Sequence, residues 1–254
     1  MKLASIINVW ACCIELIPFC IKNHLEFCDG VIVVWSQYSN HGVKNDAVLE
    51  YILGNGKDSR VQFMQLEPVS GTPLMNETRK RNFGIENARL EAYTHFLVSD
   101  ADEFYIPSEM NTEKERFNNP NLNGLVHRLK VYIKSPTLYT NDHTLICGIH
   151  KLSKDTCCGS FKDYPYAYDS EGKAHIDPSR RLSYTSGIEY SEVYMHHYSY
   201  VRKNIDLKID NSSANLRRSR QVIYDELRDA KPGYISKLYH QELKESPNYF
   251  DIVI

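Results

Sequence analysis

The stretch that decides the fold is Phe96-Leu97-Val98-Ser99-Asp100-Ala101-Asp102-Glu103-Phe104. A short apolar run of this kind is typical of a buried strand, and here it ends in two aspartates one residue apart. In open α/β sheets, ligands bind just beyond the carboxyl ends of the strands. The spacing therefore predicts two carboxylates, Asp100 and Asp102, at the rim of a sheet and next to a crevice.

Carboxylates at such a rim are suited to a hard divalent cation. Mg²⁺ binds through one or two carboxylates together with the phosphates of a substrate. Asp-x-Asp pairs also arise as helix caps and in turns, so the pair alone is a weak motif. Its position after an apolar run favours a metal ion that holds a phosphate-bearing substrate.

The residues before this stretch alternate between strands and helices. Strands are predicted at residues 3–9, 31–35, 61–66 and 96–99. Helices are predicted at residues 14–27, 43–53 and 72–92, and the last begins with a Thr-Pro cap signal. This alternation predicts βαβ units. The fold class is therefore α/β, with a mostly parallel central sheet flanked by helices.

The second half of the chain is less regular. Residues 111–123 read as a loop or a short helix, residues 125–133 and 192–201 as strands, and residues 202–254 as helical. Residues 135–181 are rich in turn residues and aromatics and show little periodicity, which predicts an irregular C-terminal half. No internal repeat or linker interrupts the chain, so we expect a single domain over residues 1–254.

Composition limits the classes of protein. The 254 residues carry a net charge of −2, so no global basic field favours nucleic acid, although a local basic patch is compatible with it. None of the seven cysteines forms a Cys-x-x-Cys pair, which indicates buried thiols in a reducing, cytoplasmic setting. No uninterrupted apolar run reaches the roughly 18 residues of a membrane span.

Common phosphate and nucleophile motifs are absent. The sequence Gly54-Asn55-Gly56-Lys57-Asp58 resembles a P-loop, but Tyr51 replaces its first glycine and Asp58 replaces the Ser or Thr that holds Mg²⁺. No G-x-G-x-x-G follows the first strand, and no G-x-S-x-G occurs. The sequence therefore favours neither a dinucleotide fold nor a serine hydrolase.

Three further features carry charge or metal-binding chemistry, each with a structural alternative. Arg79, Lys80 and Arg81 precede the aspartates on the predicted helix and suit phosphate, or form a solvated helix face. His196 and His197 face opposite sides of a predicted strand, so one of them can reach the crevice. Residues 202–220 carry six cations, which suit a polyanion, a lid over phosphates, or an exposed helix.

Together these pieces resemble the GT-A glycosyltransferases, most of all the small bacterial and phage members related to glycosyltransferase family 2. The resemblance covers roughly residues 1–205. It rests on four segments: Ile6-Ile7-Asn8, Val33-Val34-Trp35-Ser36, Arg81-Asn82-x-Gly84-Ile85 before Asp100-Ala101-Asp102-Glu103-Phe104, and His197-Tyr198-Ser199-Tyr200-Val201-Arg202.

The resemblance implies a role for each matching residue. Asp102 is expected to ligate Mn²⁺ or Mg²⁺ directly, Asp100 to reach the metal through water or to contact the donor ribose, and His197 to be a third ligand. The metal ion would bridge the diphosphate of a nucleotide sugar, most commonly a UDP-sugar in this family. The remaining donor-binding residues are expected to be Asn8, Ser36, Arg81 and Asn82.

The resemblance does not supply the catalytic base. Inverting members use a carboxylate to deprotonate the acceptor hydroxyl, and the Glu-Asp motif common at their acceptor site is missing here. The nearest analogue is Gly187-Ile188-Glu189, so Glu189 is the candidate base, with Asp177 behind it. A surface carboxylate is the alternative for Glu189.

The function implied is a metal-dependent, inverting glycosyltransferase that moves a sugar to an acceptor hydroxyl. Residues 1–105 would bind the nucleotide sugar, 106–205 the acceptor, and 206–254 form C-terminal helices. The acceptor is a glycan, a lipid-linked sugar or, as phage members allow, a hydroxymethylated pyrimidine in DNA, and the location is the cytoplasm, of the host if the chain is viral. The alternatives are a metal-dependent nucleotidyltransferase or phosphohydrolase, and a non-catalytic sugar-nucleotide-binding module.

Overall fold

The computed structural model describes residues 1–9, 11–44, 46–55, 58–212 and 216–254. The strands are β1 (Leu3–Asn8), β2 (Gly30–Trp35), β3 (Val61–Gln65), β4 (His95–Asp100), β5 (Glu103–Phe104), β6 (Gly124–Ile133), β7 (Leu138–Lys151), β8 (Ile188–Tyr200) and β9 (Lys244–Glu245). The α-helices are α1 (Ile17–Leu25), α2 (Asp46–Asn55), α3 (Pro73–Leu90), α4 (Pro107–Arg116), α5 (Ile205–Asn211) and α6 (Arg220–Asp229). Two short 3₁₀ helices, η1 (Ala11–Cys13) and η2 (Leu216–Ser219), complete the elements.

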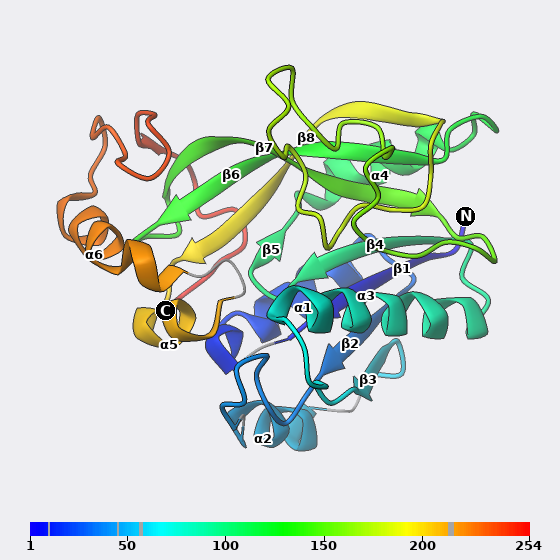
Figure 1. The fold of residues 1–254 in the computed structure, drawn as a ribbon, viewed down its shortest axis with the longest axis horizontal. Helices are drawn as coiled ribbons and strands as arrows, with labels where there is room; N and C mark the ends of the chain where they lie inside the picture. The colour runs from blue at the N-terminus through cyan, green and yellow to red at the C-terminus, as the bar shows by residue number, and fades with distance from the viewer. Residues whose placement is uncertain (10, 45, 56–57, 213–215) are drawn as a thin grey trace.

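Within the described residues, all nine strands belong to one sheet (Figure 1). Its order is β3-β2-β1-β4-β7-β6-β8-β5, and β9 pairs with β7 off this path. The strands β3, β2, β1 and β4 run parallel, as βαβ connections require. The other half is mixed, because β7 runs antiparallel to both β4 and β6 whereas β8 runs parallel to β6.

Helices cover both faces of the parallel half. On one face, Ile17 and Ile21 of α1 pack against Ile7, Val31 and Val33. On the other face, helix α3 packs against the alternate residues of the same two strands, which include Ile6 and Val34. Both strands are buried over their whole length, which explains why they read as continuous apolar runs rather than alternating ones.

Gly84 lets α3 lie close to the sheet. A Cβ atom at this position would stand 2.2 Å from Cγ2 of Ile6 and 3.2 Å from Cγ2 of Val34. Those distances are shorter than van der Waals contact, so a larger residue requires the helix to move away. The glycine therefore fixes the height of α3 above β1 and β2, and with it the position of Arg81 one turn earlier.

The two halves of the sheet meet at a short seam. Strand β4 pairs with β7 only through His95 with Lys151 and Phe96 with His150. Beyond Phe96 the two strands separate, while β4 stays paired with β1 as far as Asp100. The sheet therefore opens at the carboxyl end of β4, next to the two aspartates.

The predicted α/β class and the central sheet flanked by helices are confirmed. Each strand and helix predicted before residue 100 is present, with ends shifted by a few residues. The predicted strands at 125–133 and 192–201 correspond to β6 and β8, and α4 lies across the start of the predicted loop or short helix.

Two expectations for the second half are wrong. Residues 135–181 contain β7, a 14-residue strand whose polar stretch Thr140–Thr144 hides its alternation. The end of the chain is not continuously helical: among the described residues, no helix follows Asp229. Pro232 and Gly233, the latter at φ +79°, prevent the helix from continuing. None of the helices in the described ranges combines the length and the apolar character needed to cross a bilayer.

Candidate functional site

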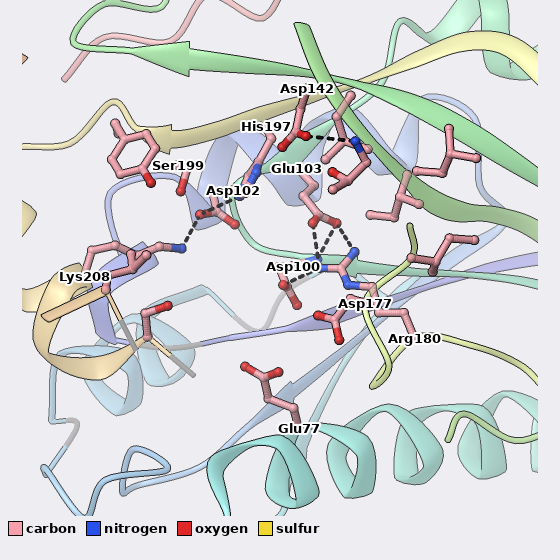
Figure 2. A pocket seen from close by; sticks show the side chains of 18 of the residues that line it. Glu77, Asp100, Asp102, Glu103, Asp142, Asp177, Arg180, His197, Ser199 and Lys208 are labelled. Atoms are coloured by element: carbon pink, nitrogen blue, oxygen red, sulfur yellow. Dashed lines mark hydrogen bonds and ion pairs between the residues drawn. The ribbon is translucent and has the colours of Figure 1, made fainter. Parts of the chain in front are cut away.

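A cavity of about 410 Å³ opens where β4 and β7 separate (Figure 2). It lies at the carboxyl ends of β1 and β4, the position at which ligands bind in open α/β sheets. Its walls come from both halves of the chain and carry acids and bases. The ionisable lining residues are Cys12, Cys13, Glu77, Asp100, Asp102, Glu103, Asp142, His175, Asp177, Arg180, His197, Tyr200, Lys208 and Tyr239.

Asp100 is the last residue of β4 and lies between two arginines. Nη2 of Arg81, on α3, is 3.3 Å from Oδ1 of Asp100, and Nη2 of Arg180 contacts Oδ2. Burial alone raises the pKa of Asp100, but Arg180 and then Arg81 outweigh burial and lower the pKa. Asp100 is therefore ionised at neutral pH, with both arginines balancing its charge.

Glu103 forms a buried ion pair with Arg180. Nη1 of Arg180 donates to Oε2 at 2.9 Å and Nη2 donates to Oε1 at 2.6 Å, which is a bidentate arrangement. The same Oε2 accepts the backbone N–H of Asp100 at 2.9 Å and the hydroxyl of Ser99 at 3.2 Å. The carboxylate of Glu103 thus accepts a backbone N–H at the end of β4, where β7 no longer pairs with this strand. It also holds Arg180 next to Asp100.

Asp102 is buried and meets three cationic or imidazole groups at one oxygen. Its Oδ2 lies 3.0 Å from Nζ of Lys208 on α5 and 3.5 Å from Nε2 of His197 on β8, and it accepts a bond from Arg202. Burial alone raises the pKa of Asp102, but Lys208, His197 and Arg202 together hold that pKa well below its usual range. Figure 2 shows Lys208 and His197 pointing toward this carboxylate from opposite sides.

The arrangement of these groups does not fit a three-ligand metal centre. In the described part of the chain, no group of three or more His, Cys, Asp or Glu side chains is placed to hold a metal ion. His197 and Asp102 face each other, but Lys208 and Arg202 already share the oxygen that a cation would need. Ligation of a metal by Asp100, Asp102 and His197 therefore stays a prediction, and at Oδ2 of Asp102 a metal ion would compete with Lys208 and Arg202.

The adjacent histidines lie on opposite sides of β8, as strand alternation predicts. His197 reaches the cavity. His196 is 1% exposed, and its Nδ1 lies 2.8 Å from the hydroxyl of Tyr132. Burial lowers the pKa of His196 to about 3, so it packs as a neutral imidazole.

The two candidate bases lie in different places. Asp177 is exposed and lines the cavity, and its Oδ1 accepts from the backbone N–H of Ser179 at 2.7 Å and from the Ser179 hydroxyl at 2.8 Å. Glu189 does not line the cavity. Its Oε2 lies 2.7 Å from Nη2 of Arg116, on α4, and its side chain is half-exposed.

The predicted donor-binding residues surround the end of β1 but do not all face the cavity. Both amide atoms of Asn8 are buried, and no hydrogen-bond partner satisfies them within the described residues. Ser36 donates to the carbonyl of Tyr38 at 2.7 Å. The side-chain amide of Asn82 donates to the carbonyl of Cys158 at 3.0 Å and accepts from the N–H of Cys158 at 2.7 Å. In this set, the amide of Asn8 and Nε of Arg81 are buried polar groups without a partner among the described residues, and Asn8 does not line the cavity.

Two adjacent thiols form another part of the wall. Sγ of Cys12 and Sγ of Cys13 are 3.6 Å apart, and Nη1 of Arg202 lies 3.6 Å from Sγ of Cys13. The hydrogen bond from Cys13 lowers the pKa of Cys12 to about 6; burial opposes this, and Arg202 and Lys208 assist it. Cys12 is therefore the more acidic of the two thiols.

Sequence reasoning missed the cations that complete the site. Arg180 and Glu103 were not singled out, and Arg202 and Lys208 appeared only as members of a basic segment. The same segment also contains Arg220, which pairs with Asp206 at 2.5 Å and with Asp210. The side chains of Arg217 and Arg218 lie outside what the structure describes. Among the described cations of this segment, Lys208 therefore lines the cavity, Arg202 is buried behind Asp102, and Arg220 is partly exposed.

The sequence matches no protein-family model, and no curated protein matches it. Among solved structures, S. aureus TarS 1–349 matches with a TM-score of 0.45 and 13% identity, over 89% of this chain and 79% of that chain. S. aureus TarS 1–349 in complex with UDP matches with a TM-score of 0.40 and 18% identity, and there this chain spans only 36% of that chain, over 52% of its own length. A 4-diphosphocytidyl-2C-methyl-D-erythritol synthase matches with a TM-score of 0.37 and 12% identity, over 59% of this chain and 74% of that chain. Similarity at this level does not identify a substrate.

Proposed function

We propose that this chain is a glycosyltransferase that moves a sugar from a nucleoside diphosphate sugar, most simply a UDP-sugar, to an acceptor hydroxyl. One observation carries the proposal. Asp100 and Asp102 lie at the mouth of a cavity at the carboxyl ends of parallel strands, and buried cations surround both carboxylates. The described lining holds six carboxylates and two fixed cations, Arg180 and Lys208, so the proposal places the negative charge of the ligand beside those two side chains.

The diphosphate of the donor is proposed to lie between Lys208 and Arg180. Both side chains line the cavity and are almost fully enclosed, so their charges act through little solvent. As the bond from the sugar C1 to the diphosphate breaks, negative charge collects on the leaving nucleoside diphosphate. Preorganised cations beside that charge lower the barrier to this step.

Asp177 is proposed as the general base. It faces the cavity and keeps Oδ2 free of the two bonds that fix Oδ1. In this role it accepts the proton of the acceptor hydroxyl while the acceptor oxygen forms a bond to C1. Glu189 is less suited, because its carboxylate is engaged by Arg116 away from the cavity.

We propose that the nucleotide contacts Asn8 at the end of β1, which is buried and is not among the described residues that line the cavity. Its amide is 1% exposed and has both a donor and an acceptor without partners in the described part of the chain. A buried amide left unsatisfied costs free energy, about 1–3 kcal/mol. A ligand that bonds to the amide removes this cost, and nucleosides present donors and acceptors at their edges.

The predicted Mn²⁺ or Mg²⁺ ion is a separate part of the proposal. A bound divalent ion would neutralise the same charge on the leaving group, and at Oδ2 of Asp102 it would compete with Lys208 and Arg202. Loss of activity on metal removal would support this ion. Activity that persists would assign the neutralising role to Lys208 and Arg180.

The experiment is nucleotide release from a panel of UDP-, GDP-, CMP- and dTDP-sugars, with Mn²⁺ and with EDTA. We expect slow hydrolysis of one donor, with a nucleoside diphosphate as the product. Release should fall strongly in Asp102→Asn and in Asp177→Asn, and Glu189→Gln is the matched control outside the cavity. Pyrophosphate release from a nucleoside triphosphate and a sugar phosphate would instead identify a nucleotidyltransferase, and no turnover with no nucleotide binding would favour a non-catalytic module.

A further inference from the structure

A second hollow, of about 270 Å³, continues from the cavity. The two share Asp142, Leu145 and His175 in their linings. The shared residues lie on or beside β7. Tyr194 is two residues from His196 and so lies on the face of β8 opposite to His197, which lines the cavity. The hollow, called the acceptor groove, therefore opens on the other face of the sheet, and a ligand in it reaches the cavity at β7, where the shared residues lie.

The acceptor groove has an aromatic wall. Tyr190 and Tyr194 project from β8, and Arg128 projects from β6, where it is paired in register with Tyr194. The guanidinium carbon of Arg128 lies 5.0 Å from the centre of the Tyr190 ring, and Nη1 is 3.4 Å from the hydroxyl of Tyr194. Arg128 thus holds both rings in place, and both remain only partly buried. Rings held in this way offer apolar area at low entropic cost.

Planar polar side chains form the rest of the groove. Nε2 of Gln241 lies 2.6 Å from Nε2 of His143, and Nε2 of His175 lies 2.6 Å from the carbonyl of His143. Asn141 also lines the groove, and its Oδ1 has no hydrogen-bond partner within the described residues. Amides, imidazoles and a carboxylate are groups that can bond to neighbouring hydroxyls as donors and acceptors together.

The charge of the groove disfavours a polyanion. Among the described residues that line it, Arg128 is the single arginine or lysine and Asp142 the single carboxylate, so the two balance. Nζ of Lys130 lies 4.6 Å from the centre of the Tyr194 ring. Oε2 of Glu192 lies a further 3.8 Å from Nη1 of Arg128. A nucleic acid backbone would place phosphates beside Asp142 with little compensation, whereas duplex-binding surfaces are strongly basic.

We propose that the acceptor groove binds a neutral saccharide and that this saccharide is the acceptor. The inference rests on the glycosyltransferase activity proposed above and deepens it. The apolar face of a sugar ring lies on Tyr190 or Tyr194, and its hydroxyls bond to Asn141, Asp142 and Gln241. The next ring then passes His175, so that one of its hydroxyls reaches Asp177 in the cavity.

The test compares nucleoside diphosphate release with and without acceptors, using the donor that the panel above identifies. The acceptors are methyl glycosides, disaccharides and trisaccharides of glucose, galactose and N-acetylglucosamine, and in parallel a DNA duplex that contains hydroxymethylcytosine. We expect at least one saccharide to accelerate release and DNA not to do so. In Tyr190→Ala and Tyr194→Ala, kcat/KM for the saccharide should fall by roughly tenfold or more, while release without acceptor stays within about twofold of the parent.

Tyr166→Ala is the matched control, because Tyr166 is 40% exposed and lines neither hollow. Acceleration by DNA alone, acceleration by no saccharide in the panel, or acceleration that both groove variants retain would each overturn the assignment of the groove. None of those results affects donor hydrolysis without acceptor. Failure of the groove is therefore distinguishable from failure of the proposed function, which would abolish hydrolysis itself.

Discussion

Lys208 and Asp102 are separated by 106 residues in the chain, yet Nζ of Lys208 lies 3.0 Å from Oδ2 of Asp102. The contact joins α5, beyond the last long strand of the sheet, to the turn after β4. Burial alone lowers the pKa of Lys208, but Asp102 outweighs burial and the pKa is raised. The pair therefore keeps a charged ammonium at the cavity wall at all physiological pH values.

Replacing Lys208 tests whether this ammonium binds the donor. In Lys208→Ala, we expect the dissociation constant of the donor nucleotide to rise by roughly ten- to a hundredfold, the usual effect of losing one charge-assisted hydrogen bond. Lys208→Arg should lose less affinity for the donor nucleotide, because the positive charge remains. Isothermal titration with the nucleoside diphosphate measures the change, and Lys203→Ala, an exposed neighbour, should bind as the parent does. Equal affinity in Lys208→Ala and the parent would remove Lys208 from the donor site.

Arg180 is expected to be a stabilising residue as well as a site residue. Arg180→Met leaves the buried carboxylate of Glu103 without its arginine and leaves Asp100 with Arg81 alone, which should lower the free energy of unfolding by about 3–5 kcal/mol. The double variant Arg180→Met/Glu103→Gln should recover part of that loss, because one uncompensated charge is gone. Urea denaturation of the parent, the two single variants and the double variant gives the interaction free energy between Arg180 and Glu103. Additive effects in this cycle would mean that the two side chains do not act as a pair.

The close approach of α3 to the sheet predicts a strong effect of one methyl group. Gly84→Ala places a Cβ atom 2.2 Å from Cγ2 of Ile6, so helix or strand must shift, at a cost of about 1–3 kcal/mol. Gly54→Ala is the control, since a Cβ atom at Gly54 meets nothing within 4 Å. Thermal unfolding should show a clear loss for the first variant and little change for the second.

Three buried histidines make stability depend on pH. Burial is the main cause that lowers the pKa of His24 to about 4, of His150 to about 4 and of His196 to about 3. The unfolded chain takes up these protons near pH 6.5, so the folded state binds fewer protons between that pH and about 4. Their contribution is therefore fully present above pH 6.5 and is lost as the pH falls, by up to about 1.4 kcal/mol per pH unit for each histidine.

Urea denaturation at pH 7.5, 6 and 5 measures this slope. In His196→Gln, the dependence of the free energy of unfolding on pH should become less steep, by up to about 1.4 kcal/mol per pH unit. The variant also loses the hydrogen bond between His196 and Tyr132. His41→Gln is the control, because His41 is exposed. A slope that does not change in His196→Gln would mean that His196 is not neutral in the folded state at pH 5.

Cys12 should react as a thiolate. With a pKa of about 6, alkylation of Cys12 by iodoacetamide should rise with pH through about pH 6 rather than through the usual 8.5 or so of a free thiol. Saturating nucleoside diphosphate should slow the reaction, because Cys12 lines the proposed donor cavity. Peptide mapping by mass spectrometry distinguishes Cys12 from Cys147, whose pKa is raised to about 12 mainly by burial. If Cys12 is labelled at the same rate with and without nucleotide, then Cys12 does not lie in the donor site.

The parts of the fold that could be predicted are those that local patterns determine. Strand β2 is a run of five large apolar residues after a glycine, and α3 begins with Thr72 accepting from the backbone of Met75 and Pro73 in its first turn. Such signals need no knowledge of distant residues. The placement of Asp100 and Asp102 at a cavity follows from the same reasoning, because a strand end has a fixed relation to its sheet.

The rest depends on residues far apart in the chain. Arg180 lies in a loop with no periodic pattern, and nothing near it indicates that Glu103 and Asp100 are its partners. Glu189 could be recognised as a carboxylate near the acceptor half, but its engagement by Arg116 depends on how α4 lies against β8. The strand β7 was missed because Asn141, Asp142 and His143 interrupt its apolar residues, and their exposure is explained only by the groove that they line.

The seam between β4 and β7 has a consequence for how this site can change. The hollow between the two strands arises because the backbone diverges after two paired residues, His95 with Lys151 and Phe96 with His150. Side chains line that gap, but the path of the backbone creates it. Substitutions in the wall therefore alter which molecule is held while the architecture that provides the space persists, and the walls on the two sides of the seam can diverge independently of each other.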